Sequence, residues 1–406
     1  MTGKMKVCLI APPFLPVPAV KGGGRETLIE LLVMENEKKR LLDLHVLSPF
    51  DEAARKFSRH YPSTKFTFLT NKGATVYKRS AWKLARAYQR YLKPDVILNP
   101  YYVEVAEFLA SAQFDLVIDE AGPHPDLRGI SRLIGIGKTG IHLHCVADQT
   151  KELHGLSGFS ISVSDYVRSR WMSARANEED DYVVCNGVDT SLFTASYPDD
   201  LRASLRDDYG FKDDDFVVLY CGRIAPEKGL IQLFRAIERV RDHRVKLLIA
   251  GEKDVNSDRN GNYFKEVIDR VEASDSKYRY LGYVDNRKLK DVYCASDVQV
   301  IPTICEEAAG LVAIEGMLSG LPQIVANSGG LVEYVDESCS VVVDRGENFV
   351  NGLADAIVKL LNDVDLRASM SDSAVKRGTR FSSSVFYSQF CDALESHLAA
   401  LENFSD

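Results

Sequence analysis

Two glutamates flank an apolar run within the segment TICEEAAGLVAIEGMLSGLP, which extends from residue 303 to residue 322. Seven residues separate Glu307 from Glu315. If the apolar part forms a helix, the second acid lies roughly 12 Å along the axis from the first, at about 1.5 Å per residue. Two carboxylates held this far apart could contact the two ends of one extended ligand. The alternative is a surface loop acid followed by one polar position on a buried helix.

A pair of cations lies in a second segment, LYCGRIAPEKGLIQLFRAI, which has the pattern of a strand, a tight turn and a helix. Arg223 follows the strand and Lys228 stands at the start of the helix, with Pro226 and Gly229 shaping the turn. Ligands of open α/β sheets bind beyond the carboxyl ends of the strands, and a helix N-terminus adds partial positive charge. The segment therefore predicts a diphosphate site, and two ordinary surface cations are the alternative.

Three consecutive glycines, Gly22, Gly23 and Gly24, lie between the first expected strand and an amphipathic helix. Glycines let backbone N–H groups approach an anion closely at a helix N-terminus. The run is not G-x-G-x-x-G, so it does not support a dinucleotide fingerprint. A phosphate-binding loop and a plain flexible loop both remain open.

Two histidines, His142 and His144, share one face of the strand-like segment TGIHLHCVAD. No third ligand has suitable spacing in the sequence, so we expect core or cleft histidines and no metal. The segment 254–266 resembles a calcium loop, but it has Arg259 where the turn glycine belongs, and its acid falls one place late, on Glu266. That segment predicts an ordinary loop.

Seven lysines or arginines and no acid occur between residues 71 and 93, although the chain as a whole is acidic. The cations that fall on one stripe of a helix are Arg79, Lys83, Arg86, Arg90 and Lys93. A stripe of a single charge sign, flanked by Trp82, favours docking to anionic lipid or to an anionic acceptor. A plain exposed helix is the alternative.

Short apolar runs that must position these side chains alternate with helical patterns along the whole chain. The first half contains KVCLIAP, DLHVLSP, PDVILNP, FDLVIDEA, GIHLHC and FSISVSD, and the second half contains DFVVLYCGR, VKLLIAGE, YRYLGYV, VQVIPT, PQIVAN and SVVVD. Such alternation predicts a doubly wound α/β architecture with parallel sheets. The polar segment 197–215 separates the two series and is the expected linker. We therefore expect two Rossmann-like domains facing a central cleft, at residues 1–195 and 196–384, with a final helix at about 385–406.

Length and composition limit the classes of function. A chain of 406 residues is long enough for two domains, and its net charge of −8 argues against general affinity for nucleic acid. Eight cysteines without a C-x-x-C pair indicate reduced thiols. Pro12 and Pro13 cut the first apolar run too short for a signal peptide, and no stretch of about 18 apolar residues occurs. We expect a cytoplasmic protein.

Taken in order, these motifs resemble those of the retaining glycosyltransferases of family 4, which have the GT-B fold. The motifs that carry the resemblance are KGGGRE, GIHLHC, SVSDYVRSRW, NGVDTSLF, GRIAPEKG, LLIAGE, LGYV, EEAAGLVAIEGMLSGLP and NSGGLVEYV. The resemblance implies a retaining, metal-independent hexosyltransferase without a cofactor. It would move a hexose or N-acetylhexosamine from a nucleotide sugar, expected to be a UDP-sugar, to a glycan or lipid-linked acceptor in polysaccharide or glycoconjugate biosynthesis.

The resemblance also implies roles for individual residues. The N-terminal domain would bind the acceptor and the C-terminal domain the donor, and the final helix would pack back on the N-terminal domain. Catalytic roles fall to Glu307 by the donor sugar, Arg223 and Lys228 on the diphosphate, and His144 in the cleft. Donor contacts fall to Gly23, Gly24, Gly222, Val284, Ala309, Gly310, Leu311, Val312 and Glu315, the last on the ribose. The charge pattern of the basic segment, and not the resemblance, assigns acceptor or membrane contacts to Arg79, Lys83, Arg86 and Arg90, which would keep the protein peripheral on the inner face of the membrane.

Two departures from the family pattern concern the segment EEAAG and Gly316. The first leaves Ala308 and Ala309 beside the donor sugar, so the identity of the sugar stays open. Gly316, in place of the usual alanine, should cost about 0.5–1 kcal/mol of helix stability and little else. Alternative functions are another GT-B enzyme, such as a sugar-nucleotide epimerase or a phosphorylase, and a non-catalytic nucleotide-sugar-binding subunit.

Overall fold

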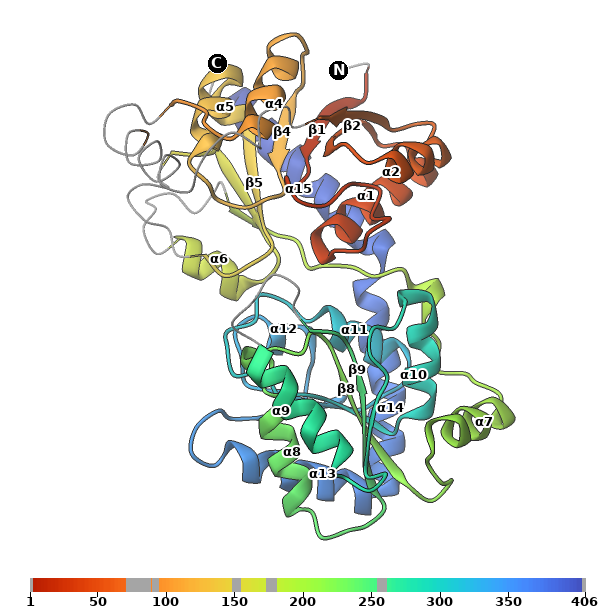
Figure 1. Ribbon diagram of the computed structural model, residues 1–406. Coiled ribbons are helices and arrows are strands. Elements are labelled where there is room, and N and C mark those ends of the chain that lie inside the picture. Colours follow the sequence, from red (N-terminus) through yellow and green to blue (C-terminus); the bar gives the residue numbers. More distant parts are fainter. Residues whose placement is uncertain are drawn as a thin grey trace. The chain divides into compact units, whose positions relative to one another are not determined.

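The computed structural model describes residues 3–70, 89, 95–147, 155–172, 181–253 and 261–403. The predicted basic stripe, including Arg79, Lys83, Arg86 and Arg90, lies outside these residues, as does the part of the predicted loop 254–266 up to residue 260. The rest of that prediction is wrong, because residues 261–266 begin helix α9 (Gly261–Glu272). The chain divides into two compact units, each a layered α/β body (Figure 1). Unit 1 comprises Met1–Gly187 and Ser383–Asp406, and unit 2 comprises Val188–Ser382. The sequence predicts a domain boundary at 195/196 and a final helix from about residue 385, whereas the two units divide after Gly187 and after Ser382.

Unit 1 is built on a parallel sheet that has seven strands within the described residues, in the order β3-β2-β1-β4-β5-β6-β7. The strands are β1 (Met5–Ile10), β2 (Leu42–Pro49), β3 (Lys65–Leu69), β4 (Leu116–Asp119), β5 (Thr139–Leu143), β6 (Phe159–Ser162) and β7 (Asp181–Val183). The helices are α1 (Gly24–Lys39), α2 (Glu52–Phe57), α4 (Pro100–Ala110), α5 (Asp126–Ile134), α6 (Asp165–Met172) and α15 (Ser383–Asn403), with short 3₁₀ turns η1 (Ser58–His60) and η2 (Ile136–Lys138).

One predicted strand of unit 1 is wrong. The described part of PDVILNP contains no strand, and Pro100 begins helix α4 instead. The side chain of Asp126 accepts hydrogen bonds from the backbone N–H groups of Leu98, at 2.7 Å, and Asn99, at 3.3 Å, and so takes donors that a sheet ladder would need. The Asn99 side chain then caps α4 by accepting from the N–H of Tyr101 at 3.1 Å.

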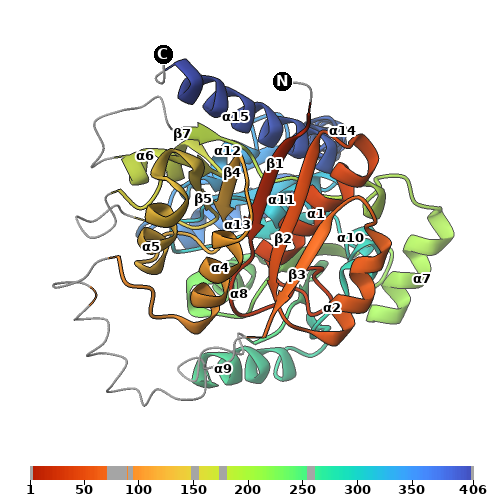
Figure 2. The same cartoon turned by 90° about the horizontal axis from the view of Figure 1, so that it is seen from above.

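Helix α15 closes the chain and belongs to unit 1, although the elements before it belong to unit 2. It packs on α1, where the Tyr387 hydroxyl donates to Asn36 Oδ1 at 2.6 Å (Figure 2). Further along the helix, Phe390 lies 6.0 Å from the His142 ring and His397 lies 4.0 Å from the Phe159 ring, measured between ring centroids. These contacts place α15 over strands β5 and β6.

Unit 2 contains a second parallel sheet, with six strands within the described residues, in the order β10-β9-β8-β11-β12-β13. The strands are β8 (Phe216–Cys221), β9 (Val245–Ala250), β10 (Tyr278–Tyr280), β11 (Val298–Ile301), β12 (Gln323–Ala326) and β13 (Ser340–Val343). The helices are α7 (Asp199–Tyr209), α8 (Leu230–Arg239), α9 (Gly261–Glu272), α10 (Leu289–Ala295), α11 (Leu311–Leu318), α12 (Leu331–Tyr334), α13 (Phe349–Asn362) and α14 (Val364–Gly378), with 3₁₀ turns η4 (Thr190–Leu192), η5 (Pro226–Lys228), η7 (Asn286–Lys288) and η8 (Thr379–Phe381).

All six strands predicted in the second half of the sequence are present. They are nearly continuous apolar runs because helices cover both faces of a parallel sheet. The chain therefore forms two Rossmann-like α/β units, as expected from the alternation of strands and helices.

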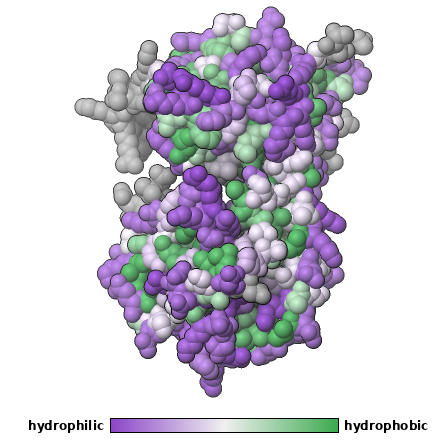
Figure 3. Space-filling model, turned by 90° about the vertical axis from the view of Figure 1, so that its right-hand side faces the viewer, coloured by the Kyte–Doolittle hydropathy of each residue, from purple (hydrophilic) through white to green (hydrophobic). Residues whose placement is uncertain are grey.

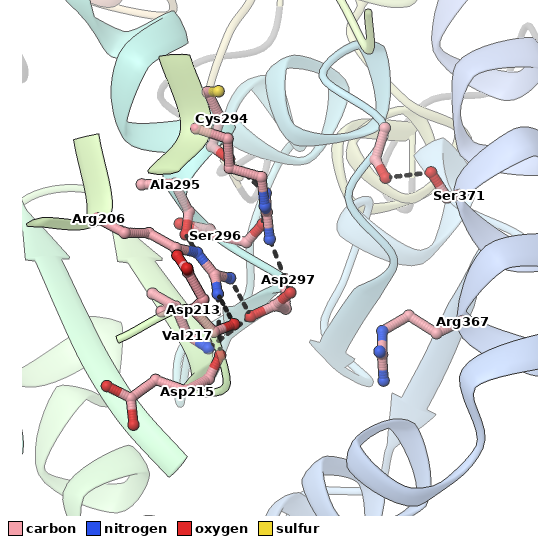
Figure 4. Close-up of polar contacts among 12 residues, drawn as sticks. Arg206, Asp213, Asp215, Val217, Cys294, Ala295, Ser296, Asp297, Arg367 and Ser371 are labelled. Atoms are coloured by element: carbon pink, nitrogen blue, oxygen red, sulfur yellow. Dashed lines mark hydrogen bonds and ion pairs between the residues drawn. The ribbon is translucent and has the colours of Figure 1, made fainter. Parts of the chain in front are cut away.

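The polar segment expected to be a linker is instead fixed to unit 2 (Figure 4). Helix α7 lies within it, and the side chain of Arg206 is only 5% exposed. Arg206 pairs with Asp297 at 2.6 Å and donates to the backbone carbonyls of Ala295, Asp213 and Asp215 at 3.0–3.1 Å. A buried guanidinium with this many acceptors holds α7 against the core of unit 2.

Hydrophilic residues cover much of the face drawn in Figure 3, with apolar residues scattered among them. Among the described residues, no helix combines the length and the apolar character that crossing a bilayer requires.

Candidate active site

The carboxyl edge of the unit 2 sheet gathers most of the predicted donor-binding residues. Strands β8, β11, β12 and β13 are parallel, and β8 lies beside β11, which lies beside β12. Their carboxyl ends therefore meet at one edge, where ligands of open α/β sheets bind. Arg223 follows β8, and the loop that carries Glu307 follows β11.

Lys228 and Glu307 form an ion pair at this edge. The Nζ atom of Lys228 lies 2.6 Å from Oε1 of Glu307, and the two side chains are 24% and 17% exposed. Gly229, at φ +73°, lets the turn that carries Lys228 approach the opposite loop, because a Cβ there would collide with the carbonyl oxygen of Pro302. The Ile304 N–H donates to the Glu227 carbonyl at 2.9 Å and joins the same two segments. The structure thus brings together two of the four predicted catalytic residues.

Arg223 lies two residues after β8 and carries a more exposed cation than Lys228. Its backbone carbonyl accepts a hydrogen bond from the Tyr220 hydroxyl at 2.7 Å, which fixes the main chain. Its guanidinium is 55% exposed and lies 3.8 Å from Glu227. More than half of this guanidinium is exposed, so a ligand anion can reach it.

Two residues that the sequence analysis missed hold the loop around Glu307. The hydroxyl of Ser328 accepts from the Glu307 N–H at 3.0 Å and donates to the Cys305 carbonyl at 2.6 Å. The Gly330 N–H donates to the Glu307 carbonyl at 2.7 Å. Ser328 lies in the motif NSGGLVEYV, so the resemblance contained a signal for this contact.

Arg345 is the second of these residues and follows β13. It donates to the carbonyls of Cys305 at 3.0 Å, Ile304 at 3.2 Å and Asn327 at 2.9 Å, and it pairs with the carboxylate of Glu306. Its planar fork thus fixes the backbone just before Glu307. An arginine after a last strand gives no sequence signal for this role.

Helix α11 begins at Leu311, directly after the loop. The backbone of Ala309, Gly310 and Val312 therefore lies at a helix N-terminus, where N–H groups and the helix dipole favour anions. Gly222, with φ +146°, lies directly after β8, and Val284 lies in the loop after β10.

Glu315 lies one turn further along α11 and is partly buried. Its Oε2 atom accepts a hydrogen bond from the Tyr293 hydroxyl at 2.9 Å. Burial raises the pKa of the Glu315 carboxyl to about 7, and the bond from Tyr293 opposes this shift. A carboxylate that gains stability from hydroxyl donors suits a ligand with a vicinal diol.

Gly316 has a packing role that the sequence analysis underestimated. A Cβ at this position would collide with Oε1 of Gln299 and lie 2.7 Å from Nε2 of Gln323. Both glutamines are fully buried and pair in register on β11 and β12. The prediction that this glycine has little consequence beyond helix propensity is therefore wrong.

The predicted glycine loop and His144 belong to unit 1, whereas the residues described so far belong to unit 2. Gly22 and Gly23 have positive φ angles of 72° and 104°, and α1 begins at Gly24. A Cβ on Gly23 would collide with the carboxyl group of Glu26, whose pKa is raised by burial. The loop therefore places a carboxyl group beside its backbone N–H groups, and an ionised Glu26 would repel a phosphate.

His144 follows strand β5 and lies beside His142 and Glu120, which follows β4. Oε2 of Glu120 lies 2.9 Å from Nδ1 of His142 and 2.7 Å from Nε2 of His144. Burial by itself would raise the pKa of Glu120, but the two histidines lower it to about 2. Burial and the neighbouring His142 lower the pKa of His144 to about 4, although Glu120 acts in the opposite direction.

Glu120 supplies the third ligand that sequence spacing did not show. The ligand atoms of this trio all lie within 4.8 Å of one another, so the three residues could hold a metal ion. The register of β4 and β5, which places Asp119 opposite Ile141, brings Glu120 beside His142. The sequence does show Glu120, at the end of FDLVIDEA, but only the pairing of β4 with β5 reveals that this acid lies beside the two histidines.

Solved structures with the same architecture define the class of fold. The HepE protein of Anabaena, solved in complex with UDP-glucose, has a TM-score of 0.73 at 19% identity, covering 97% of this chain and 100% of that chain. The sucrose-phosphate synthase of Thermosynechococcus elongatus has a TM-score of 0.74 at 18% identity, covering 98% and 100%. The chain therefore has two Rossmann-like units of the kind found in GT-B glycosyltransferases.

Sequence comparisons identify the family of the domain in unit 2. Residues 202–377 match the family model described as Glycosyl transferases group 1, so unit 2 carries a domain of this family. An uncharacterized glycosyltransferase of Methanocaldococcus jannaschii is 28% identical over 239 residues, which cover 57% of this chain and 59% of that protein. A D-inositol 3-phosphate glycosyltransferase of Stackebrandtia nassauensis is 31% identical over 213 residues, covering 51% and 46%. The chain spans about half the length of these curated relatives.

Proposed function

We propose that the protein transfers a sugar from a nucleotide-sugar donor to an acceptor hydroxyl group. The observation that carries this proposal is the pair of Lys228 and Glu307, 2.6 Å apart, beside the N-terminus of α11 at the carboxyl edge of the unit 2 sheet. A cation and a carboxylate in this place suit a ligand with a diphosphate next to a sugar ring. The group 1 domain in unit 2 supports this interpretation.

The proposed donor is a UDP-sugar that carries a hexose or an N-acetylhexosamine. The structural neighbour HepE was solved with UDP and with UDP-glucose, which supports this choice. The proposed acceptor is a glycan or a lipid-linked saccharide in polysaccharide or glycoconjugate biosynthesis. Its support is a relative from Salmonella typhimurium, a lipopolysaccharide 1,2-N-acetylglucosaminetransferase, which is 30% identical over 158 residues covering 38% of this chain and 40% of that protein.

In the proposed reaction the bond between the anomeric carbon and the diphosphate oxygen breaks, and the acceptor oxygen bonds to the same face of that carbon. The configuration is retained because the new bond forms on the face that the diphosphate leaves, and the leaving phosphate takes the proton of the acceptor hydroxyl. Arg223 and Lys228 would neutralise the diphosphate as its charge grows, which is the task a metal ion performs in other transferases. We therefore propose that transfer needs no metal and no cofactor.

Lys228 would bridge two anions in this arrangement. Its Nζ atom already contacts Glu307, so a bound diphosphate adds a second acceptor to an ammonium group that has three donors. Glu307 would then lie beside the donor sugar, and Glu315 would accept hydrogen bonds from the ribose. Glu307 lies in the loop before α11 and Glu315 lies one turn into the helix, so the two acids come from different parts of this segment.

A thermal-shift screen against UDP-, GDP- and ADP-sugars tests the proposal. A donor at 100 times its Kd should stabilise the protein by about 2.7 kcal/mol. We expect one nucleotide class to raise Tm, and Lys228→Met to abolish that rise. The absence of a shift with every nucleotide sugar would contradict the proposed function. Binding without turnover on any acceptor would instead favour a non-catalytic subunit.

We also propose peripheral contact with anionic membrane through the basic segment 71–93. Its support is the sequence alone, with seven cations and no acid. Flotation with liposomes that contain anionic lipid should recover the protein, and reversal of Arg79, Lys83, Arg86 and Arg90 to glutamate should release it. Equal flotation of this variant would contradict the proposal.

A further inference from the structure

Unit 1 contains a cluster of three buried metal-ligating side chains that the proposed transfer does not use as a unit. Glu120 follows β4, and His142 and His144 lie at the end of β5. Their side chains are 1%, 0% and 4% exposed. The ring of His142 also faces the aromatic residues Phe386 and Phe390 of α15, with centroids 6.4 and 6.0 Å away.

Among the described residues, no lysine or arginine forms an ion pair with Glu120. A buried carboxylate needs a partner of opposite charge, because removing an ion from water costs several kcal/mol. Within the described part of the chain its ion-pair partners are the two histidines, which are charged only if protonated. The nearby Arg25 directs its guanidinium to the Ala121 carbonyl at 2.7 Å and to Sγ of Cys145 at 3.6 Å. Oε1 of Glu120 also has no hydrogen-bond partner among the described residues.

The spacing of the three ligand atoms fits one metal ion. With metal–ligand bonds of about 2.1 Å, two ligands at right angles are about 2.9 Å apart. The observed separations from Oε2 of Glu120 are 2.9 Å to Nδ1 of His142 and 2.7 Å to Nε2 of His144. The two imidazole centroids are 4.0 Å apart. If each centroid lies about 3.2 Å from the ion, that separation corresponds to an angle of about 80°.

We propose that Glu120, His142 and His144 bind a divalent first-row transition-metal ion. Three mutual angles near 90° place the ligands on one face of an octahedron, as in sites with two histidines and one carboxylate. Such a site leaves the remaining positions to oxygen ligands from water or from a hydroxyl-bearing molecule. The ion neutralises Glu120 and links the ends of β4 and β5. One ligand, His144, is also a predicted catalytic residue, whereas Glu120 and His142 have no predicted role in transfer. The predicted donor-binding residues other than the glycine loop lie in unit 2.

Metal titration of untagged, EDTA-treated and dialysed protein tests the proposal. Isothermal titration with Co²⁺ and equilibrium dialysis should give one ion per chain, and the Co²⁺ absorption should be weak, as for six-coordinate cobalt. Glu120→Gln keeps the shape of the side chain but removes its charge, and it should weaken Co²⁺ binding about 100-fold or more, since even residues behind the ligands contribute 10–100-fold. His124→Asn is the matched control, because His124 lies in the same region, 3.2 Å from Asp119, outside the trio. It should bind Co²⁺ like the wild type.

His142→Gln provides a second variant in case Glu120→Gln fails to fold. Co²⁺ should also raise the Tm of the wild type and of His124→Asn, and leave the Tm of the ligand variants unchanged. Substoichiometric binding by the wild type, or equal binding by wild type and both ligand variants, would overturn the proposal and leave a hydrogen-bonded trio. Neither result would affect the thermal shift by nucleotide sugars, so the two proposals fail separately.

Discussion

At the scale of single residues, the two cations at the carboxyl edge of the unit 2 sheet differ in exposure and in ion pairing. The Lys228 side chain is 24% exposed and lies 2.6 Å from Glu307, whereas the Arg223 side chain is 55% exposed and lies 3.8 Å from Glu227. A bound diphosphate would therefore gain most new charge compensation from Arg223. This difference makes Arg223 the sharper test of leaving-group stabilisation.

Replacing Arg223 with alanine should lower kcat by about 10²-fold or more, because the lost cation acts on charge that grows as the diphosphate leaves. The stability of the protein should change little, since exposed ion pairs contribute about 0–1 kcal/mol. Steady-state kinetics with the donor found in the screen measure the effect. Arg55→Ala is the matched control, because Arg55 is 53% exposed and pairs with Glu52 on α2. Near-wild-type turnover of Arg223→Ala would refute its role.

Glu315 should make stability depend on pH. Its folded-state pKa is raised from 4.5 to about 7, so the folded protein binds a proton that the unfolded chain releases. The contribution is fully present below pH 4.5 and is lost as pH rises through 7; it is on the order of 3 kcal/mol at most. Urea unfolding at pH 5 and pH 8 should show a smaller loss of stability for Glu315→Gln than for the wild type. Parallel pH profiles would contradict the raised pKa.

At the scale of elements, the carboxyl ends of four parallel strands, β8, β11, β12 and β13, form the candidate site. Residues that follow β12 and β13 hold the loop after β11 in place. Ser328 follows β12 and Arg345 follows β13, and both bind the backbone beside Glu307. The position of Glu307 is thus set by residues far from it in sequence.

Arg345→Ala should lower kcat/KM by about 10-fold or more, since displacing a reacting group by about 1 Å can cost 10²-fold. Arg345→Lys should not restore activity, because one ammonium group cannot reproduce a fork that reaches three carbonyls. Arg367→Ala is the control for loss of an arginine that binds carbonyls, since Arg367 donates to Leu360 and Leu361. Equal kinetics for Arg345→Ala and Arg367→Ala would remove the positioning role.

Gly316→Ala should destabilise unit 2 by about 1–3 kcal/mol, because the added Cβ collides with the buried side chain of Gln299 and lies close to that of Gln323. Gln299→Ala opens space at that contact, so the double variant should lose less than the sum of the two single variants. Urea unfolding of all four proteins gives the coupling energy. Gly261→Ala is the control, because Gly261 begins α9 and a Cβ there would meet only Nζ of Lys253, at 4.0 Å. If the losses of stability in the two single variants add up in the double variant, the collision with Gln299 is not the cause of the destabilisation.

The elements also show what a sequence can predict. The strands of unit 2 were predictable because each is an apolar run between helical patterns. The region around Ile97 was not, because its backbone N–H groups are taken by Asp126, a residue of a later helix. At the site, Lys228 and Glu307 followed from the motif order, whereas Arg345 and Glu120 depend on which strands pair, and spacing along the chain does not contain that information.

At the scale of the whole molecule, the chain completes unit 1 last. Helix α15 follows all of unit 2 in the sequence, yet its buried face packs on α1, β5 and β6 of unit 1. The first 187 residues therefore lack part of their core until the final helix has been made. Unit 2, in contrast, is continuous from Val188 to Ser382.

Phe390→Ala should destabilise unit 1 selectively, by about 3–5 kcal/mol, since it removes a fully buried aromatic side chain from the interface of α15 with the sheet. Hydrogen exchange measures the effect by unit: amides of β1 and β5 should exchange faster, while those of β8 and β11 should keep their wild-type protection. Glu395→Ala, an exposed position on the same helix, should change neither set. Equal loss of protection in both sheets would show that the two units unfold together, and unchanged exchange everywhere would show that α15 contributes little to the core of unit 1.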